Sequence, residues 1–220
     1  MKIYIGFDVT KPKCFDVCEY SIRQRTDKIL IDKIGNSILS NDIWYRTRSE
    51  LETTDFSICR FLVPYLSNYN GISVFMDDDF LWQCDIKELM NYYDESKSVM
   101  VCKHDYTPKH AKKWSNNKQT TYRRKNWSSL MMFNNAHQDC KKLDVKTVNE
   151  EAGLWLHQFE WTEKIGAIPL SYNFLVDEYE PYENIKALHF TNGCPIFDEC
   201  KNQDFADKWI YEKRNLDSCR

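Results

Sequence analysis

Short apolar runs alternate along the chain with segments that favour helices, and this alternation is typical of an α/β domain. Runs rich in aliphatic and β-branched residues predict strands at 2–8, 28–34, 72–76 and 98–103. The segments that follow them predict helices at 12–24, 54–66, 85–93 and from 203 onward. Polar stretches at 35–53 and 108–125 predict loops, the second of them basic.

Local signals set the expected ends of two of these helices. Pro12 opens the first, since proline is tolerated in a first helical turn. Thr54 and Asp55 are expected to cap the helix at 54–66, and Pro64 to end or kink it. In the first strand, Gly6 is expected to permit close backbone approach.

The run 72–76 ends in three carboxylates, Asp77, Asp78 and Asp79, which we call the acidic tip. Ligands of open α/β sheets bind beyond the carboxyl ends of the strands, which is where this tip is expected. Alternate residues of an extended segment point the same way, so Asp77 and Asp79 can converge on one cation while Asp78 turns aside. Their hard oxygen ligands suit Mg²⁺ or Mn²⁺. A solvated acidic turn is the alternative reading.

Composition narrows the class of protein. The chain has 220 residues and a net charge of −3, fits one large domain, and shows no linker and no basic footprint of a nucleic-acid binder. Its nine cysteines are an odd number without metal-site spacing, so we expect reduced thiols that mostly fill the core. The chain begins with a strand and has no apolar window of the ~18 residues that a membrane span needs, so we expect a cytoplasmic location.

Three segments, in a fixed order, resemble the nucleotide-sugar-binding core of GT-A glycosyltransferases, especially glycosyltransferase family 8. They are 57–66 with Arg60, 74–79 with the acidic tip, and 85–89. The resemblance extends to about residue 195 and implies a GT-A fold over 1–220: a single α/β domain with a central, mostly parallel sheet flanked by helices. The chain is also similar to the glycosyltransferase module with which a large algal DNA virus decorates its capsid protein.

The resemblance implies donor-binding residues in the first half of the chain. Gly6 and Asp8 would line the edge that holds uracil and ribose, and Asp78 would lie beside the donor. Arg60 would face the nucleotide-sugar, with an ordinary salt bridge as the alternative. His104, in a dense polar run after the strand at 98–103, would contact the donor sugar or belong to a solvated turn.

Further implied positions lie in the second half. The segment 126–135 resembles the strand that lines the sugar pocket, with Ser128 and Ser129 where the family has small residues, and 165–174 supplies Tyr172 and Asn173 as donor contacts. A helix expected to start at Thr147 would bring Asn149 and Glu151 beside the anomeric carbon as catalytic residues with Asp79, although helix capping also explains such acids. His189 would be the third metal ligand beside Asp77 and Asp79, and Gly193 would follow at the donor. Cys194 stands where the family has a lysine.

The implied reaction is a metal-dependent, retaining transfer of a hexosyl unit, glucose- or rhamnose-like, from a UDP-sugar to a hydroxyl of a glycan or glycoprotein. A Mn²⁺ or Mg²⁺ ion would stabilise charge on the departing diphosphate as a Lewis acid. Two alternatives stay open. A metal-dependent nucleotidyltransferase would also use paired carboxylates, but it should show a glycine-rich phosphate loop that this chain lacks. A non-catalytic nucleotide-sugar-binding module would bind the donor without turning it over.

Overall fold

The computed structural model describes residues 1–49, 52–109 and 122–219. Within them, the main sheet has six strands in the order β2-β1-β3-β6-β5-β7. β6 pairs antiparallel with both of its neighbours, and the remaining pairs are parallel. The strands are β1 Lys2–Gly6, β2 Leu30–Ile34, β3 Ile72–Met76, β5 Val99–Cys102, β6 Leu130–Asn134 and β7 Ile165–Ile168. The predicted α/β fold with a mostly parallel central sheet is confirmed.

A second, smaller sheet continues from the acidic tip. It has the order β4-β9-β8, with β4 at Phe80–Trp82, β9 at Ala187–His189 and β8 at Phe174–Leu175. β9 pairs antiparallel with β4, so the residue after the acidic tip lies opposite the end of β9. This sheet thus joins the middle of the chain to its last quarter.

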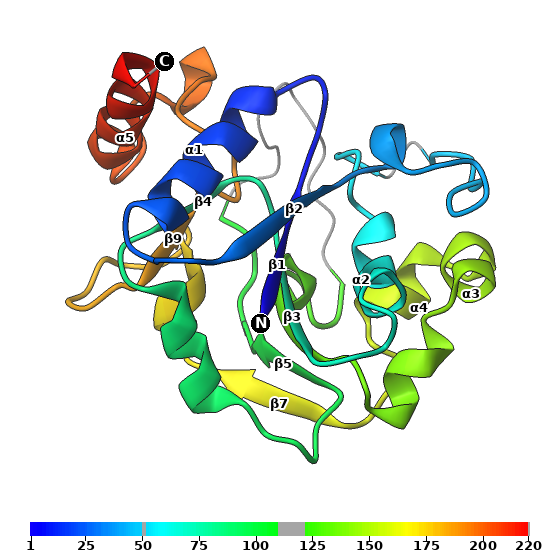
Figure 1. Ribbon diagram of the computed structural model, residues 1–220. Coiled ribbons are helices and arrows are strands. Elements are labelled where there is room, and N and C mark those ends of the chain that lie inside the picture. The colour runs from blue at the N-terminus through cyan, green and yellow to red at the C-terminus, as the bar shows by residue number, and fades with distance from the viewer. Residues whose placement is uncertain (50–51, 110–121, 220) are drawn as a thin grey trace.

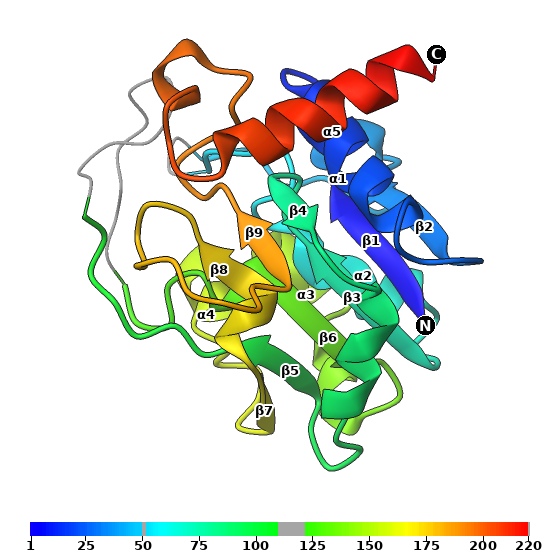
Figure 2. The ribbon, with the colours of Figure 1, turned by 90° about the vertical axis from the view of Figure 1, so that its left-hand side faces the viewer.

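Helices cover both faces of the main sheet. Figure 1 shows α1 (Pro12–Arg23) beside α5 (Ala206–Ser218) on one side of the main sheet, and Figure 2 shows the same two helices crossing each other. On the other side lie α2 (Val63–Leu66), α3 (Val145–Glu150) and α4 (Gly153–His157). No helix among the described residues is long and apolar enough to cross a membrane.

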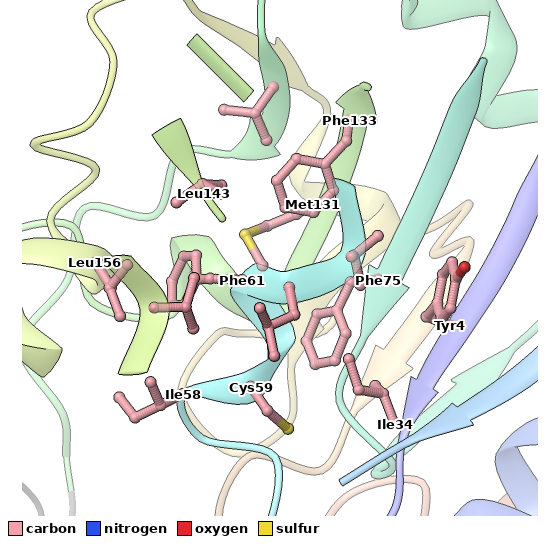
Figure 3. Close-up of a cluster of buried hydrophobic side chains, with 14 of the residues drawn as sticks. Tyr4, Ile34, Ile58, Cys59, Phe61, Phe75, Met131, Phe133, Leu143 and Leu156 are labelled. Atoms are coloured by element: carbon pink, nitrogen blue, oxygen red, sulfur yellow. The ribbon is translucent and has the colours of Figure 1, made fainter. Parts of the chain in front are cut away.

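Alternate residues of the central strands enter different clusters. Tyr4 and Phe75 belong to the cluster that contains Phe61, whereas Ile5 and Val74 pack on the opposite face with Phe15 of α1. Figure 3 shows the first cluster, to which Phe61, Phe75 and Met131 all belong. A fully buried side chain of this size stabilises the fold by roughly 1.5–3 kcal/mol. These two clusters fix the sheet that carries the acidic tip.

The helix predicted at 54–66 is wrong in its details. The chain forms a 3-10 helix at Cys59–Leu62 and then the short α2, and Pro64 lies in the first turn of α2 rather than ending it. Asp55 caps neither, because its carboxylate accepts from the backbone N–H of Ser37 at 2.9 Å. Arg60 explains the break, since its Nε donates to the carbonyls of Phe56 and Ser57 and competes with regular helical bonds.

Another helix starts earlier than predicted. α3 begins at Val145, not at Thr147, because the Asp144 carboxylate accepts from the Thr147 N–H at 2.7 Å and caps the helix. Glu151 therefore follows the carboxyl end of α3 instead of lying near its start.

The nine cysteines are all free, and seven of them are buried, which confirms the prediction of reduced thiols.

Candidate active site at the carboxyl ends of the strands

The acidic tip leaves the main sheet where β3 ends. The Asp77 N–H donates to the Ser129 carbonyl at 3.0 Å, which continues the β3–β6 ladder by one bond. The Asp77 and Asp79 side chains are 18% and 14% exposed, whereas Asp78 is fully buried. The predicted alternation of the three carboxylates is therefore present in the structure.

Arg60 lies under the acidic tip and holds Asp77. Its Nη1 donates to Asp77 Oδ1 at 2.6 Å and to the Ser128 carbonyl at 3.0 Å. The guanidinium carbon lies 4.8 Å from the centre of the Phe75 ring, a cation–π contact. Because Arg60 is only 5% exposed and has bonds on several sides, it positions the Asp77 carboxylate. The salt bridge that was the alternative for Arg60 is present, and its contact with the nucleotide-sugar stays a prediction.

His189 reaches the site through the second sheet. It lies opposite Phe80 in the β4–β9 register, and the two rings stack with centroids 4.5 Å apart. The Phe190 N–H donates to the Asp79 carbonyl at 3.0 Å, so the strand ends are held together. His189 Nε2 lies 3.2 Å from Asp79 Oδ1, and the side chain of His189 is 1% exposed.

Asn173 and Ser129 set the tautomer of His189. Ser129 Oγ donates to the Asn126 carbonyl at 2.7 Å and accepts from Asn173 Nδ2 at 2.9 Å. Asn173 Oδ1 is thereby turned toward His189 Nδ1 at 2.8 Å, where it can only accept. Whenever the imidazole is neutral, this contact places its proton on Nδ1 and directs the Nε2 lone pair toward Asp79. This hydrogen bond is the support that metal-binding histidines ordinarily have.

The structure thus brings Asp77, Asp79 and His189 together. One ligand atom from each lies within 4.8 Å of the other two. A lone pair facing a carboxylate oxygen is repulsive unless a cation or a proton lies between them. Two carboxylates and one imidazole suit Mn²⁺, which accepts both nitrogen and oxygen ligands, and also Mg²⁺. The residues present fit a divalent cation.

Asp78 is turned away from this cluster. Its Oδ1 accepts from Lys11 Nζ at 2.6 Å, and both side chains are buried. A buried ammonium thus occupies that oxygen, and the contact between Asp78 and the donor stays a prediction. Sequence reasoning missed Lys11, since nothing in the residues around Pro12 indicates an ion pair with a residue 67 positions away.

Gly6 and Asp8 lie where β1 ends, beside the acidic tip. A Cβ at Gly6 would come within 2.5 Å of the Phe56 ring, so the expected close approach at this glycine is confirmed. The Asp8 carboxylate accepts from the N–H and hydroxyl of Thr10 and from the Asp55 N–H. Burial alone would raise the pKa of Asp8, but these hydrogen bonds lower it and keep the carboxylate charged. Asp8 therefore shapes the loop at the strand end.

His104 lies at the end of β5 and is 5% exposed. Its Nδ1 shares a hydrogen bond of 2.9 Å with the Tyr179 hydroxyl, and its Nε2 has no hydrogen-bond partner among the described residues. Burial, and then the nearby His189, lower the pKa of His104 to about 3, so the ring is neutral. The structure therefore excludes a solvated turn for this residue.

Other expected donor contacts have structural partners. Ser128 Oγ shares a hydrogen bond with His157 Nδ1 at 2.8 Å. Tyr172 is buried, and its hydroxyl donates to Glu88 at 3.1 Å. Gly193 has a φ of 127°, favoured by glycine, and its carbonyl accepts from Gln203. These contacts show what holds each residue in place.

The candidate residue Asn149 lies near the carboxyl end of α3, and the candidate Glu151 directly follows that helix. Asn149 uses its whole amide on backbone groups: Oδ1 accepts from Tyr45 and Arg46, and Nδ2 donates to Ile43 and Val145. These four bonds use the hydrogen-bonding capacity of the Asn149 amide, and its catalytic role stays a prediction. Glu151 is exposed.

Most of the basic loop that the sequence predicts at 108–125 lies outside the described residues.

Comparison with known proteins supports this fold. The sequence matches none of the known protein-family models. Protein CDI of Arabidopsis thaliana is 41% identical over 220 residues, covering 96% of this chain and 85% of the plant protein. Among solved structures, the galactosyltransferase LgtC, in complex with donor and acceptor sugar analogues, has a TM-score of 0.63 at 10% identity, covering 98% and 96% of the two chains.

Two further solved structures share the fold. The glycosyltransferase GlyE of Streptococcus pneumoniae has a TM-score of 0.62 at 9% identity and covers 96% of this chain, which spans 60% of GlyE. Mouse xyloside xylosyltransferase 1 has a TM-score of 0.52 at 10% identity, covering 88% and 99% of the two chains. All three are glycosyltransferases, and at these identities they establish the GT-A fold alone.

Proposed function

The chain belongs to the family of Arabidopsis thaliana Protein CDI, and we propose that it is a metal-dependent glycosyltransferase. The observation that carries the proposal is the convergence of Asp77, Asp79 and His189, with one ligand atom of each within 4.8 Å of the others. The GT-A fold supports it, because the cluster lies at the carboxyl ends of strands, where ligands of such sheets bind.

The donor we propose is a UDP-sugar, from which a hexosyl unit, glucose- or rhamnose-like, passes with retention to a hydroxyl of a glycan or glycoprotein. Asp77, Asp79 and His189 would hold Mn²⁺ or Mg²⁺, whose chemistry is to neutralise charge on the departing diphosphate. Arg60 orients Asp77, and Asn173 orients His189. The rest of the site would bind the donor and keep water from it.

The nucleoside end of the donor would lie against the end of β1. Gly6 and Asp8 are there, one beside the Phe56 ring and the other charged within its loop. His104 would contact the sugar through Nε2, which is buried and has no hydrogen-bond partner among the residues described. Glu151 stays a proposed catalytic residue. A role of the enzyme in decorating a viral capsid also stays a proposal.

A non-catalytic nucleotide-sugar-binding module is a second candidate. The observation that favours it is Asn149, a residue proposed for catalysis whose amide is fully used by the backbone. Both candidates bind a nucleotide-sugar with a metal, and only the enzyme turns the donor over.

The test uses the full chain with a panel of UDP-, GDP- and dTDP-sugars, with Mn²⁺ or with chelator. We expect calorimetric binding of a UDP-sugar that requires Mn²⁺, and release of UDP when an acceptor glycan is added. Asp79→Ala should abolish release, while Asp139→Ala, a carboxylate outside this site, should not. Metal-dependent binding without release of UDP would favour the non-catalytic module, and equal release in chelator would contradict the metal mechanism.

A further inference from the structure

A buried ion pair connects the amino end of α1 to the middle of the acidic tip. Lys11 Nζ lies 2.6 Å from Asp78 Oδ1, and the two side chains are 4% and 0% exposed. Lys11 directly precedes α1, and its backbone N–H donates to the Asp8 carbonyl at 3.0 Å. The pair therefore ties the loop after β1 to the residue between the two metal-site carboxylates.

The short contact makes Lys11 and Asp78 an ion pair. Burial lowers the pKa of Lys11, but Asp78 and other nearby groups together raise it well above its usual range. Asp79 acts on Lys11 in the same direction as Asp78. Burial also raises the pKa of Asp78, and Lys11 opposes that rise. A charge this deeply buried has to be paired, and the pair together is neutral.

A contribution to the stability of the fold does not explain well why an ion pair is buried at this position. Replacing a buried ion pair by apolar residues of similar size is often neutral or stabilising, because desolvation of two charges offsets their attraction. An apolar pair lacks a directional contact. The short contact between the Lys11 and Asp78 side chains restrains both backbone segments relative to each other. Asp78 is bonded on each side to a residue whose carboxylate belongs to the metal site.

We propose that the Lys11–Asp78 pair is a positioning device for the metal site, which holds Asp77 and Asp79 aimed at the cation before the cation binds. The proposal rests on the proposed function, because it assigns the device to the same cluster. Lys11 is a positioning residue, since it acts through Asp78 and would touch neither the metal nor the donor.

An electrostatic role of Lys11 and a positioning role predict opposite changes in metal affinity. If Lys11 acted only as a nearby cation, its removal would strengthen the binding of a dication, because like charges repel. If it positions the tip, its removal together with Asp78 leaves the net charge unchanged and weakens binding. Residues that orient metal ligands typically change affinity 10–100-fold when they are lost.

The experiment measures Mn²⁺ binding to the full chain without nucleotide, by calorimetry or electron paramagnetic resonance. In the double variant Lys11→Met, Asp78→Leu we expect the dissociation constant to rise about tenfold, with kcat at saturating Mn²⁺ changed less than the Mn²⁺ concentration for half-activation. Lys11→Arg keeps the pair and should stay near the wild type. Lys13→Met is the matched control, because Lys13 lies two residues away and pairs with Asp217 at the surface.

A folded double variant with the wild-type dissociation constant would overturn the proposal, as would a lower melting temperature with no change in Mn²⁺ binding. If that variant does not fold, Lys11→Gln with Asp78→Asn replaces it, because a neutral amide pair can keep one hydrogen bond. Failure of the proposed function looks different: the wild-type chain itself would then bind neither Mn²⁺ nor a nucleotide-sugar.

Discussion

His189 Nε2 lies 3.2 Å from Asp79 Oδ1, while the other nitrogen of the ring is bonded to Asn173. Asp79 directly precedes β4, whereas His189 ends β9 more than a hundred residues later, and the β4–β9 register brings the two residues together. A neutral imidazole here directs a lone pair at a carboxylate, an arrangement that favours a cation between them. The first two predictions follow from this geometry.

Removing His189 should weaken metal binding more than it weakens folding. His189→Ala leaves two carboxylates as protein ligands, so we expect the Mn²⁺ dissociation constant to rise at least tenfold, measured by calorimetry. His137→Ala is the control, since His137 caps the 3-10 helix Gln138–Lys142 and does not belong to the cluster. Equal Mn²⁺ affinity in the two variants would exclude His189 as a ligand.

Asn173 should matter through the tautomer that it selects. Asn173→Leu removes the acceptor for His189 Nδ1, so the imidazole can place its proton on either nitrogen, and we expect about tenfold weaker Mn²⁺ binding. Asn173→Asp keeps an acceptor and should bind Mn²⁺ better than the leucine variant. Nitrogen chemical shifts of the His189 ring report the tautomer directly. A ring protonated on Nε2 in the wild type would contradict this account.

Arg60 should not tolerate replacement by lysine. One ammonium cannot reproduce the contacts with Phe56, Ser57, Asp77 and Ser128, so Arg60→Lys should lower the free energy of unfolding by about 1–3 kcal/mol and weaken UDP-sugar binding. Urea unfolding and calorimetry measure the two effects. Arg123→Lys, in an exposed pair with Glu160, should change neither. Wild-type donor affinity in Arg60→Lys would show that Asp77 needs no guanidinium.

His104 should make the fold sensitive to acid. Its pKa is about 3 in the folded protein because it is buried, against an ordinary value of about 6.5 when unfolded. Between these values the unfolded state binds more protons, so the free energy of unfolding should fall as the pH drops from 6.5 toward 3, by up to about 1.4 kcal/mol per pH unit. His104→Phe should show a shallower fall in urea unfolding at several pH values. An unchanged slope would mean that His104 titrates alike in both states.

The strand of the acidic tip was predictable from the sequence, because its signal is local. Apolar residues at 72–76 followed at once by carboxylates define both the strand and the direction of Asp77 and Asp79. His189 followed from the resemblance and from the order of the motifs. The helix at 54–66 was not predictable, since propensity does not reveal that the Arg60 side chain binds the carbonyls of its own preceding turn.

Contacts between distant residues explain the remaining differences. Asn149 and Asp78 are polar residues in suggestive places, and only the fold shows that backbone groups use the first and Lys11 the second. Sequence patterns indicate which residue types are present. How much of a side chain's hydrogen-bonding capacity is already used depends on the residues that pack beside it in the fold. The structural partners of such residues therefore cannot be predicted from residue type and position alone.

The pairing of β4 with β9 also affects when, during synthesis and folding, the Asp79–His189 contact can form. Until a chain has been synthesised past residue 189 and that strand has docked, Asp79 has no histidine opposite it. Such distant pairing forms late and slowly, because the intervening chain has to be closed into a loop first. A cation bound at the proposed site would stabilise only molecules in which β9 has docked. Retention of Mn²⁺ would then report that this pairing has formed.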